Sequence, residues 1–153
     1  MPVFNGELFI RKAIDSLLAQ TFSDFELIIS DNASTDSTSE ICKEYEKKDS
    51  RIRYIRQSKN MGAYWNFYFV LKQAKYDYFL WASADDYWHP DFLKKNIEIL
   101  LSKKNVVCSI SKVQPYKLDN TNLNRPTNSV KYPSFIQGFV KKRRHAMISV
   151  TFP

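Results

Sequence analysis

Hydrophobic and polar residues follow one another along the first 110 residues in a pattern that predicts helices and strands in turn. Apolar residues recur at helical spacing in several segments, and short apolar or β-branched runs separate these segments. We predict helices over residues 5–18, 37–45, 64–74 and 90–101, and strands over 25–30, 51–55, 76–82 and 106–110. Helices and strands that alternate with short connections are typical of an α/β sandwich with a largely parallel sheet.

Individual residues indicate where these helices begin. Asn5 is a suitable N-cap for the first helix. Ser37 followed by Glu40 has the spacing of a capping box, and Asp36 is a second candidate cap for the same helix. Pro90 suits the first turn of the helix that ends near residue 101.

The composition is that of a folded domain. The chain has 153 residues, of which 44% are hydrophobic and 25% charged, which excludes a disordered, collagen-like or low-complexity chain. No apolar run approaches the roughly 20 residues that cross a bilayer. Cys42 and Cys108 are too few and too far apart for a disulfide scaffold or a zinc site, so we expect a reduced, cytoplasmic compartment.

Charge is distributed unevenly between the two parts of the chain. Residues 1–100 carry 13 basic and 15 acidic side chains, whereas residues 101–153 carry 10 basic and one acidic, Asp119. Within this basic part we predict a long loop over 114–133 and the start of a helix over 135–140. Such a segment attracts anions, which leaves phosphate, nucleic acid and a lipid surface open as partners.

Polar clusters follow three of the predicted strands, at residues 31–36, 58–62 and 83–86. In an open parallel sheet, ligands bind beyond the carboxyl ends of the strands. Asp85 and Asp86 repel each other unless a cation such as Mg²⁺ or Mn²⁺ lies between them, although one of them could instead cap the next helix.

The other two clusters also have two interpretations each. Asp31 is placed to accept hydrogen bonds from a ribose hydroxyl or a pyrimidine N–H, or else to cap the turn that follows it. Gly62 permits the chain to approach a ligand closely, or else forms an ordinary turn.

Five motifs occur in order over residues 2–110: Pro2–Glu7 (PVFNGE), Ser16–Phe22 (SLLAQTF), Phe25–Asp36 (FELIISDNASTD), Asn60–Gly62 (NMG), and Ala84–Asp86 (ADD) with Pro90–Leu93 (PDFL). In this order and spacing they resemble the family 2 glycosyltransferases of the GT-A fold. The resemblance implies transfer of a sugar, with inversion, from a nucleotide-diphosphate sugar to a saccharide or lipid-linked acceptor. It implies a GT-A-like, three-layer sandwich with a mostly parallel sheet.

Site residues follow from the same resemblance. The nucleotide-binding residues implied are Pro2, Phe4, Glu7, Asp31, Asn60, Gly62, Ala84 and Asp85, and the ligands of Mg²⁺ or Mn²⁺ are Asp85 and Asp86. Asp31 would hold the base of a uridine-type nucleotide. The resemblance implies that residues 1–112 form the nucleotide-sugar-binding domain and residues 113–153 an incomplete, loop-rich and basic acceptor-side segment.

The chain departs from the family pattern in three places. Ser83 stands where the acidic motif begins with Asp, and the first strand is missing or shortened. No acidic residue lies at the family's general-base position, because Asp119 comes too early and His145 lies in a basic run. The alternative function is therefore a nucleotide-binding remnant that lacks the base, and the chain resembles a family member truncated at both ends.

Other partners and functions make distinct predictions. A phosphoacceptor signalling domain would need its acidic pair after the first strand, which this chain does not have. We expect no nucleic-acid partner, since the aromatic residues over 64–81 have the spacing of a core and the basic run 141–144 also suits an anionic membrane surface. Peripheral membrane contact and a homo-oligomer formed through an exposed sheet edge stay open.

Overall fold

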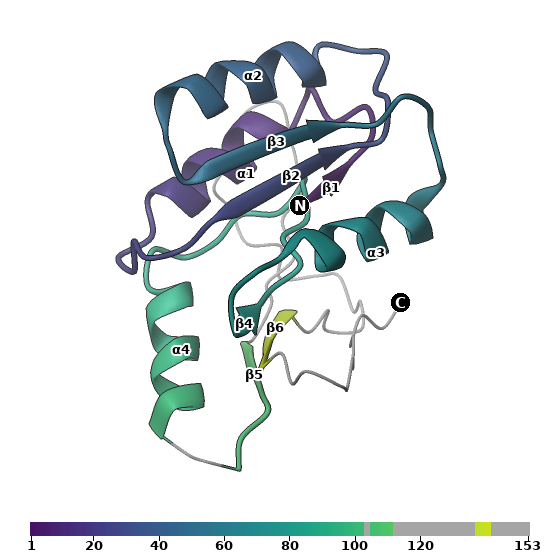
Figure 1. Cartoon of the computed structure of the whole chain (residues 1–153). Coiled ribbons are helices and arrows are strands. Elements are labelled where there is room, and N and C mark those ends of the chain that lie inside the picture. Colours follow the sequence, from purple (N-terminus) through teal and green to yellow (C-terminus); the bar gives the residue numbers. More distant parts are fainter. Residues whose placement is uncertain (103–104, 112–136, 142–153) are drawn as a thin grey trace, which may run out of the picture.

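Three parallel strands form the first of two small sheets (Figure 1). The computed structural model describes residues 1–102, 105–111 and, by backbone alone, 137–141. The strands are β1 (Pro2–Val3), β2 (Leu27–Asp31) and β3 (Ile52–Arg56), in the order β1-β2-β3. β2 pairs with β3 along its full length, whereas β1 pairs only with Ser30 and Asp31. The first strand is thus present in shortened form.

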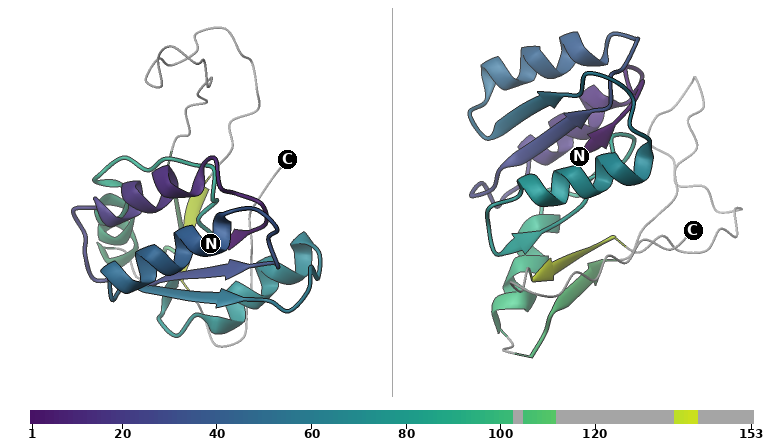
Figure 2. Two further views of the ribbon diagram at one scale, coloured as in Figure 1. Left: turned by 90° about the horizontal axis from the view of Figure 1, so that it is seen from above. Right: turned by 45° about the vertical axis from the view of Figure 1, so that its right-hand side comes forward.

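Helices cover both faces of this sheet, which gives the three layers that the sequence predicts (Figures 1 and 2). α1 (Ile10–Leu18) and α2 (Thr38–Lys48) lie on one face, and α3 (Ala63–Gln73) lies on the other. Every residue of β2 is buried, as expected of a strand covered on both sides. The buried stripe of α1, spaced at three and four residues, packs in the same core: Ile10, Ala13, Ile14 and Leu17.

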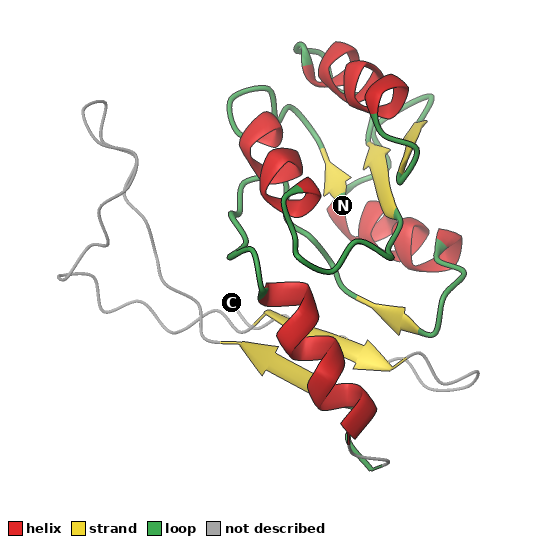
Figure 3. Ribbon diagram, turned by 90° about the vertical axis from the view of Figure 1, so that its left-hand side faces the viewer, coloured by secondary structure: helices red, strands yellow, loops and turns green. Residues whose placement is uncertain are grey.

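The second sheet contains β4 (Tyr78–Phe79), β6 (Gln137–Lys141) and β5 (Cys108–Ser111), with β6 in the centre and antiparallel to both neighbours. α4 (Phe92–Ser102) lies across this sheet (Figure 3). The helix predicted over 135–140 is therefore wrong. Strand neighbours on both sides satisfy the backbone there, which the local sequence did not reveal. The strand predicted over 76–82 is also shorter than expected.

One of these predicted helix starts and one predicted capping contact are wrong, whereas α2 begins at Thr38 directly after Ser37, as predicted. α1 begins at Ile10 and not near Asn5, because Asn5 adopts a positive φ of 52°. Ser37 occupies the N-cap of α2 but makes no capping hydrogen bond through its side chain. The second candidate was correct, since Asp36 accepts a hydrogen bond from the Thr38 amide at 3.0 Å.

α4 also begins later than predicted, at Phe92, so Pro90 precedes the helix. The cap comes from a distant residue, because the Gln20 side-chain oxygen accepts a hydrogen bond from the Leu93 amide at 2.9 Å. The same side chain donates to the His89 carbonyl at 2.8 Å, which ties the end of α1 to the start of α4.

Several predictions fall on residues outside the described ranges. These are the loop over 114–133, Asp119, His145 and the basic side chains of 141–144. Among the described residues, no helix combines the length and apolar character needed to cross a bilayer.

The amino group of Met1 is buried against β2. It donates a hydrogen bond to the Ile28 carbonyl at 2.7 Å, and Met1 itself is 2% exposed. Burial removes water from the charged form and lowers the pKa of this amine from 8.0 to about 5. The folded 153-residue chain therefore holds this amine neutral at pH 7.

This burial predicts a pH dependence of stability. The unfolded chain binds a proton at this amine below pH 8, while the folded chain binds it only near pH 5. The contribution is favourable above pH 8 and is lost progressively as the pH falls towards 5, by at most roughly 4 kcal/mol for a shift of this size. Urea denaturation of the chain with and without N-terminal acetylation measures it. Acetylation should make the free energy of unfolding change less steeply between pH 8 and pH 5. An equally steep change with and without acetylation would contradict the prediction.

Candidate functional site

Two loops at the carboxyl ends of β1 and β2 are joined by hydrogen bonds between backbone amides and side chains. The Asn5 amide donates to the Ser34 hydroxyl at 2.9 Å, and the Asn5 side-chain oxygen accepts from the Thr35 amide at 2.8 Å. The positive φ of Asn5 turns the chain sharply at this point. The Asn of the first motif thus orients one loop against the other.

The next residues of the two loops continue the same pattern. The Gly6 amide donates to the buried Thr38 hydroxyl at 2.8 Å. The Glu7 amide donates to the Asp36 carboxylate at 3.1 Å, and the Glu7 carboxylate accepts from the Ser37 amide at 2.9 Å. Glu7, which the resemblance placed in the nucleotide pocket, holds the start of α2 in this structure.

Asp36 is the carboxylate at the centre of this contact. Partial burial raises the pKa of its carboxyl, but the hydrogen bonds from the Thr38 side chain and from the amides of Glu7 and Thr38 together lower it below the ordinary value. The charged form of Asp36 is therefore part of the folded state.

Asp31 lies at the end of β2 and is fully buried. One carboxylate oxygen accepts from the Ser34 amide at 2.8 Å, and the other accepts from the Tyr54 hydroxyl at 2.7 Å and the Arg56 guanidinium at 3.1 Å. Burial raises the pKa of Tyr54 to about 12, and its hydrogen bond to Asp31 acts in the same direction. Both oxygens of Asp31 are therefore engaged within the chain, and Arg56 is the member of this cluster that is exposed.

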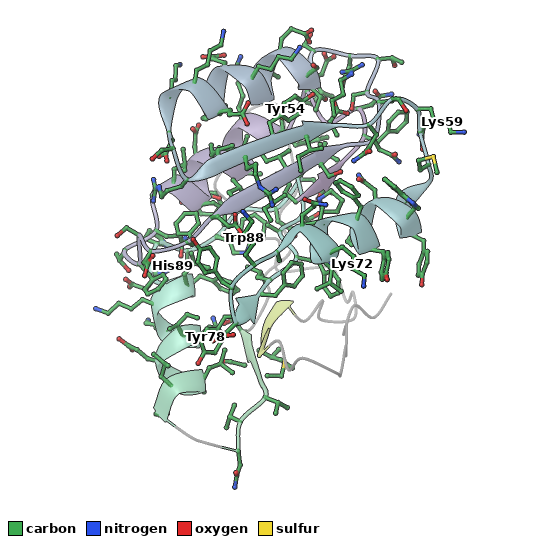
Figure 4. The ribbon with its side chains drawn as sticks, viewed as in Figure 1. Tyr54, Lys59, Lys72, Tyr78, Trp88 and His89 are labelled. Carbon is green, nitrogen blue, oxygen red and sulfur yellow. The ribbon has the colours of Figure 1, made fainter. Side chains whose placement is uncertain are left out.

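The loop after β3 is fixed to the loop after β2 by Asn32. The Asn32 side chain donates to the Asn60 side-chain oxygen at 2.8 Å and to the Gly62 carbonyl at 3.2 Å, and accepts from the Met61 amide at 2.9 Å. Gly62 has a φ of 85°, a conformation that other residues resist. In Figure 4, Lys59 marks the tip of this loop and Tyr54 lies on β3 below α2.

A buried side-chain amide of α3, that of Asn66, contacts strands β1 and β2. The Asn66 side chain donates to the Ser30 carbonyl at 2.9 Å and to the Val3 carbonyl at 3.4 Å. Its side-chain oxygen accepts from the Ser30 hydroxyl at 2.5 Å. These contacts fix the last residues of β1 and β2, from which the two joined loops emerge.

The acidic segment after β4 returns to the end of β1. A Cβ added to Gly6 would lie 3.9 Å from the Ala84 Cβ, which is ordinary van der Waals contact, and would clash with a Val3 methyl group at 2.7 Å. The Ser83 hydroxyl donates to the Asp85 carboxylate. Asp85 is exposed and Asp86 is half-buried. The acidic pair and the loop after β1 are therefore neighbours.

Trp88 anchors this segment to the core. It is 2% exposed, packs with Val3 and Ile14, and its amide donates to the Ser16 hydroxyl at 3.2 Å. Figure 4 shows Trp88 below the parallel sheet and His89 beside it, near the start of α4. A buried side chain two residues after Asp86 limits the movement of the acidic pair.

The acidic pair suits a hard divalent cation in its chemistry, because carboxylate oxygens are the preferred ligands of Mg²⁺ and Mn²⁺. No group of three or more His, Cys, Asp or Glu side chains that would hold a metal ion occurs among the residues that the structure describes. Asp85 and Asp86 would therefore hold a cation only together with oxygens from a substrate or from water.

The candidate residues from the sequence fall into three groups by their exposure. Phe4, Glu7, Asn60, Gly62 and Asp85 are exposed at the ends of the strands, Ala84 and Asp86 are half-buried, and Pro2 and Asp31 are buried beneath them. We call the exposed and half-buried residues of the segments 4–7, 32–38, 56–62 and 83–86 the rim.

Sequence reasoning missed four polar residues at the rim: Arg56, which belongs to it, and the buried side chains of Asn32, Thr38 and Asn66, which hold its segments in place. Asn32 and Thr38 lie in or beside a motif already singled out, where their burial was not predictable. Arg56 is the last residue of β3, and its place at a strand end was the available signal. Asn66 is a buried amide among aromatic residues of α3, and no pattern marked its partners.

The comparisons with known proteins all lead to glycosyltransferases. Residues 1–152 match the family described as "Glycosyl transferase family 2". The dTDP-rhamnosyl transferase RfbG of Shigella flexneri is 36% identical over 121 residues, which is 76% of this chain and 42% of RfbG. The putative teichuronic acid biosynthesis glycosyltransferase TuaG of Bacillus subtilis is 33% identical over 102 residues, 67% of this chain and 40% of TuaG.

Solved structures show the same fold. S. aureus TarS (residues 1–349), solved in complex with UDP, has a TM-score of 0.61 and 29% identity, over 66% of this chain and 30% of that one. The mannosyltransferase PcManGT of Pyrobaculum calidifontis, in complex with GDP-Man and Mn²⁺, has a TM-score of 0.63 and 20% identity, over 70% of this chain and 32% of that one. The similarity to PcManGT concerns the fold alone. The chain spans less than half the length of each of these proteins.

Loss of one buried hydroxyl should weaken the joined loops. Thr38→Val leaves the Gly6 amide without its acceptor in a buried place, so we expect a loss of about 1–3 kcal/mol in the free energy of unfolding. Thr35→Val is the matched control, because that hydroxyl is exposed and its contact to Asn5 is 3.4 Å long. It should change stability by less than about 0.5 kcal/mol. Equal effects in urea denaturation would contradict the proposed role of Thr38.

Proposed function

The chain belongs to glycosyl transferase family 2, and we propose that its rim binds the nucleotide of a nucleotide-diphosphate sugar, with the sugar transferred to a saccharide or lipid-linked acceptor. The observation that carries the proposal is the position of Ala84 next to Gly6, because it puts the acidic pair beside the loop after β1, which is itself joined to the loop after β2. A nucleotide diphosphate needs both parts: a pocket for the nucleoside and a cation site for the pyrophosphate. That TarS was solved with UDP supports a uridine-type nucleotide.

Phe4 and the Asp31 cluster are our candidates for the nucleoside. Phe4 is 47% exposed at the end of β1, and an aromatic ring in this place offers a face for stacking on a base. Asp31 lies behind the Arg56 guanidinium, whose side chain is 41% exposed. We propose that a base reaches Asp31 when the Arg56 side chain moves aside. Pro2, Glu7, Asn60 and Gly62 support or border this pocket.

Asp85 and Asp86 would hold Mg²⁺ or Mn²⁺ together with the pyrophosphate. When bound, the cation would neutralise the charge that develops on the departing diphosphate. The Ser83 hydroxyl orients the Asp85 carboxylate, since it donates to it directly. In an inverting transfer the acceptor oxygen attacks the anomeric carbon as the bond to the diphosphate breaks, and a general base removes the acceptor proton.

We assign no residue as the general base. The sequence beyond Glu98 contains one acidic residue, Asp119, which lies outside the described residues. This observation favours a second candidate function, nucleotide binding without sugar transfer. Release of UDP from UDP-GlcNAc, measured with and without an added saccharide acceptor, separates the two: turnover supports a transferase, and binding without turnover supports the second candidate.

The domain division, the cellular location, the oligomeric state and the length of the whole protein are also matters of proposal. We propose that residues 1–112 are the donor-binding domain and that the basic segment 113–153 belongs to the acceptor side, where it would also suit an anionic membrane surface. A cytoplasmic location and a homo-oligomer are further proposals, and the chain's share of its relatives' length leads us to propose that it is a fragment of a longer enzyme.

Metal-dependent binding of UDP tests the proposal directly. Isothermal titration of the native chain with UDP should show binding that strengthens on addition of Mn²⁺. Asp85→Ala should weaken binding in the presence of Mn²⁺ by about tenfold or more, or at least 1.4 kcal/mol. Asp24→Ala, an exposed carboxylate beyond the opposite end of β2, is the matched control and should bind normally. An absence of metal-dependent binding by the native chain would contradict the proposal.

Phe4 should contribute to affinity and not to stability. If a base stacks on its ring, Phe4→Ala should lower the affinity for UDP by about 5- to 150-fold, given about 1–3 kcal/mol for a stacked base. Leu8→Ala is the matched control, because Leu8 is 81% exposed in the same loop. Thermal midpoints of both variants should stay close to that of the native chain. Equal affinities of the two variants would remove Phe4 from the site.

A further inference from the structure

The helix α3 is apolar on both of its faces. Five of its eleven residues are aromatic, and its inner face packs in the domain through the buried residues Asn66, Val70 and Leu71. A helix that covers a sheet normally presents polar side chains on the face that meets solvent. In α3 that outer face is formed largely by aromatic rings, which the packing of the inner face does not require.

Two rows of rings form this outer face. Tyr64 and Tyr68 are four residues apart, so they lie one above the other on the helix, and they are 88% and 40% exposed. Trp65 and Phe69 form the adjacent row; both are half-buried, and their rings stack with centroids 5.0 Å apart. We call these four rings the aromatic face. The core positions predicted from the spacing of the aromatic residues are therefore wrong for Tyr64 and Tyr68.

The charges near the aromatic face are all positive along the chain. Residues 57–76 contain three lysines, Lys59, Lys72 and Lys75, and no acidic residue; the next acidic residue is Asp77, beyond the end of the helix. All three lysines are exposed, and Figure 4 shows Lys59 on the loop that leads into α3 and Lys72 on α3 itself. The helices α1, α2 and α4 each carry at least one carboxylate, so α3 differs from them in its charge.

We propose that the aromatic face binds an anionic membrane surface, with its rings among the lipid headgroups and the three lysines beside the lipid phosphates. Tyrosine and tryptophan suit the boundary between lipid and water, because each has an apolar body and a polar tip. Lysine side chains are long enough to lie along apolar surface while their ammonium groups reach the phosphates. A helix with these two features lies flat along the surface of a membrane.

The contacts among the rings favour a lipid surface over a ligand that stacks. Nucleic-acid bases bind aromatic residues on open ring faces. In the aromatic face, Trp65 and Phe69 cover one face of each other, and the Lys72 ammonium lies over the Tyr68 ring, 5.3 Å from its centroid. A second copy of the chain is a poorer occupant, because a symmetric contact through this face would bring the lysines of both copies together.

The aromatic face adjoins the rim but is separate from it. Gly62, the last residue of the rim segment 56–62, is the N-cap of α3. A membrane along α3 would therefore bring the headgroup of a lipid-linked acceptor to the edge of the rim. This last step rests on the proposed function, whereas the membrane contact itself does not depend on nucleotide binding or on sugar transfer.

Sedimentation of the full chain with lipid vesicles tests the charges. The native chain should bind vesicles of equimolar phosphatidylglycerol and phosphatidylcholine more tightly than vesicles of phosphatidylcholine alone. Lys72→Glu combined with Lys75→Glu should weaken binding to the anionic vesicles by about 30-fold or more. The matched control is Lys94→Glu combined with Lys95→Glu, which makes the same change in net charge at exposed positions of α4 and leaves the basic segment 113–153 intact. It should weaken binding by about threefold at most, because salt screens charges that do not touch the membrane.

A second set of variants tests the rings. Tyr64→Ser combined with Tyr68→Ser should weaken binding to the anionic vesicles by about tenfold. Ile99→Ser combined with Leu101→Ser, which removes exposed apolar side chains from α4, should leave it close to the native value. Vesicles with brominated acyl chains should quench the tryptophan fluorescence of the native chain, and Trp65→Phe should remove most of this quenching.

Two controls separate folding and nucleotide binding from membrane contact. The thermal midpoints of the charge and tyrosine variants should stay close to that of the native chain, since the replaced side chains are exposed. If a double tyrosine variant does not fold, Tyr64→Ser alone replaces it. Titration of the same variants with UDP in the absence of vesicles should give the native affinity, so that a failure of the proposed nucleotide site is measured independently.

Several results would overturn the proposal. These are an absence of binding to the anionic vesicles, equal weakening by the two pairs of lysine variants, tyrosine variants that bind as tightly as the native chain, and quenching that persists in Trp65→Phe. A dimer through α3 that excludes the vesicles, or binding of single-stranded DNA that is lost with Tyr64 and Tyr68, would assign the aromatic face to another partner.

Discussion

The candidate site depends on the five hydrogen bonds between backbone amides and side chains that join the loops after β1 and β2. Each one satisfies an amide that a loop would otherwise leave to water, and together they fix two segments that are about 30 residues apart in sequence. The side chains of Asn5, Glu7 and Asp36 already accept hydrogen bonds between the two loops. The groups left for a ligand are those the loops present outward: the Phe4 ring, the Arg56 guanidinium and the Asp85 carboxylate.

These contacts divide the motif residues into those that hold the two loops together and those that are available to a ligand. Most residues of PVFNGE and DNASTD stabilise the shape of the rim, while few of them face solvent as binding groups. Asp31 is the clearest case, because its carboxylate organises Ser34, Tyr54 and Arg56 around the end of β2. Replacing such a residue would therefore affect stability and ligand affinity together, and a stability measurement is needed beside every affinity.

The sequence was informative where local patterns decide structure. The stripe of α1 and the β-branched run of β2 predicted their elements, and the order of the motifs predicted the family and the fold. The sequence was misleading where residues far apart in the chain determine the local structure. Gln20 caps α4, and the strand at 137–141 depends on partners in β4 and β5. The geometry of Asp31 was also hidden, since one residue's position in a motif does not show that Tyr54 and Arg56 occupy its oxygens.

The central claim is that the joined loops and the acidic pair form a single site for a nucleotide and a cation. Paramagnetic broadening of amide signals in the ¹⁵N-labelled chain by Mn²⁺ in the presence of UDP measures their proximity to one ion. The account predicts saturable broadening of residues 84–87 together with residues 5–7 and 34–37, and no effect on residues 97–101. Broadening of residues 84–87 without the loop residues, or no saturable broadening, would contradict it.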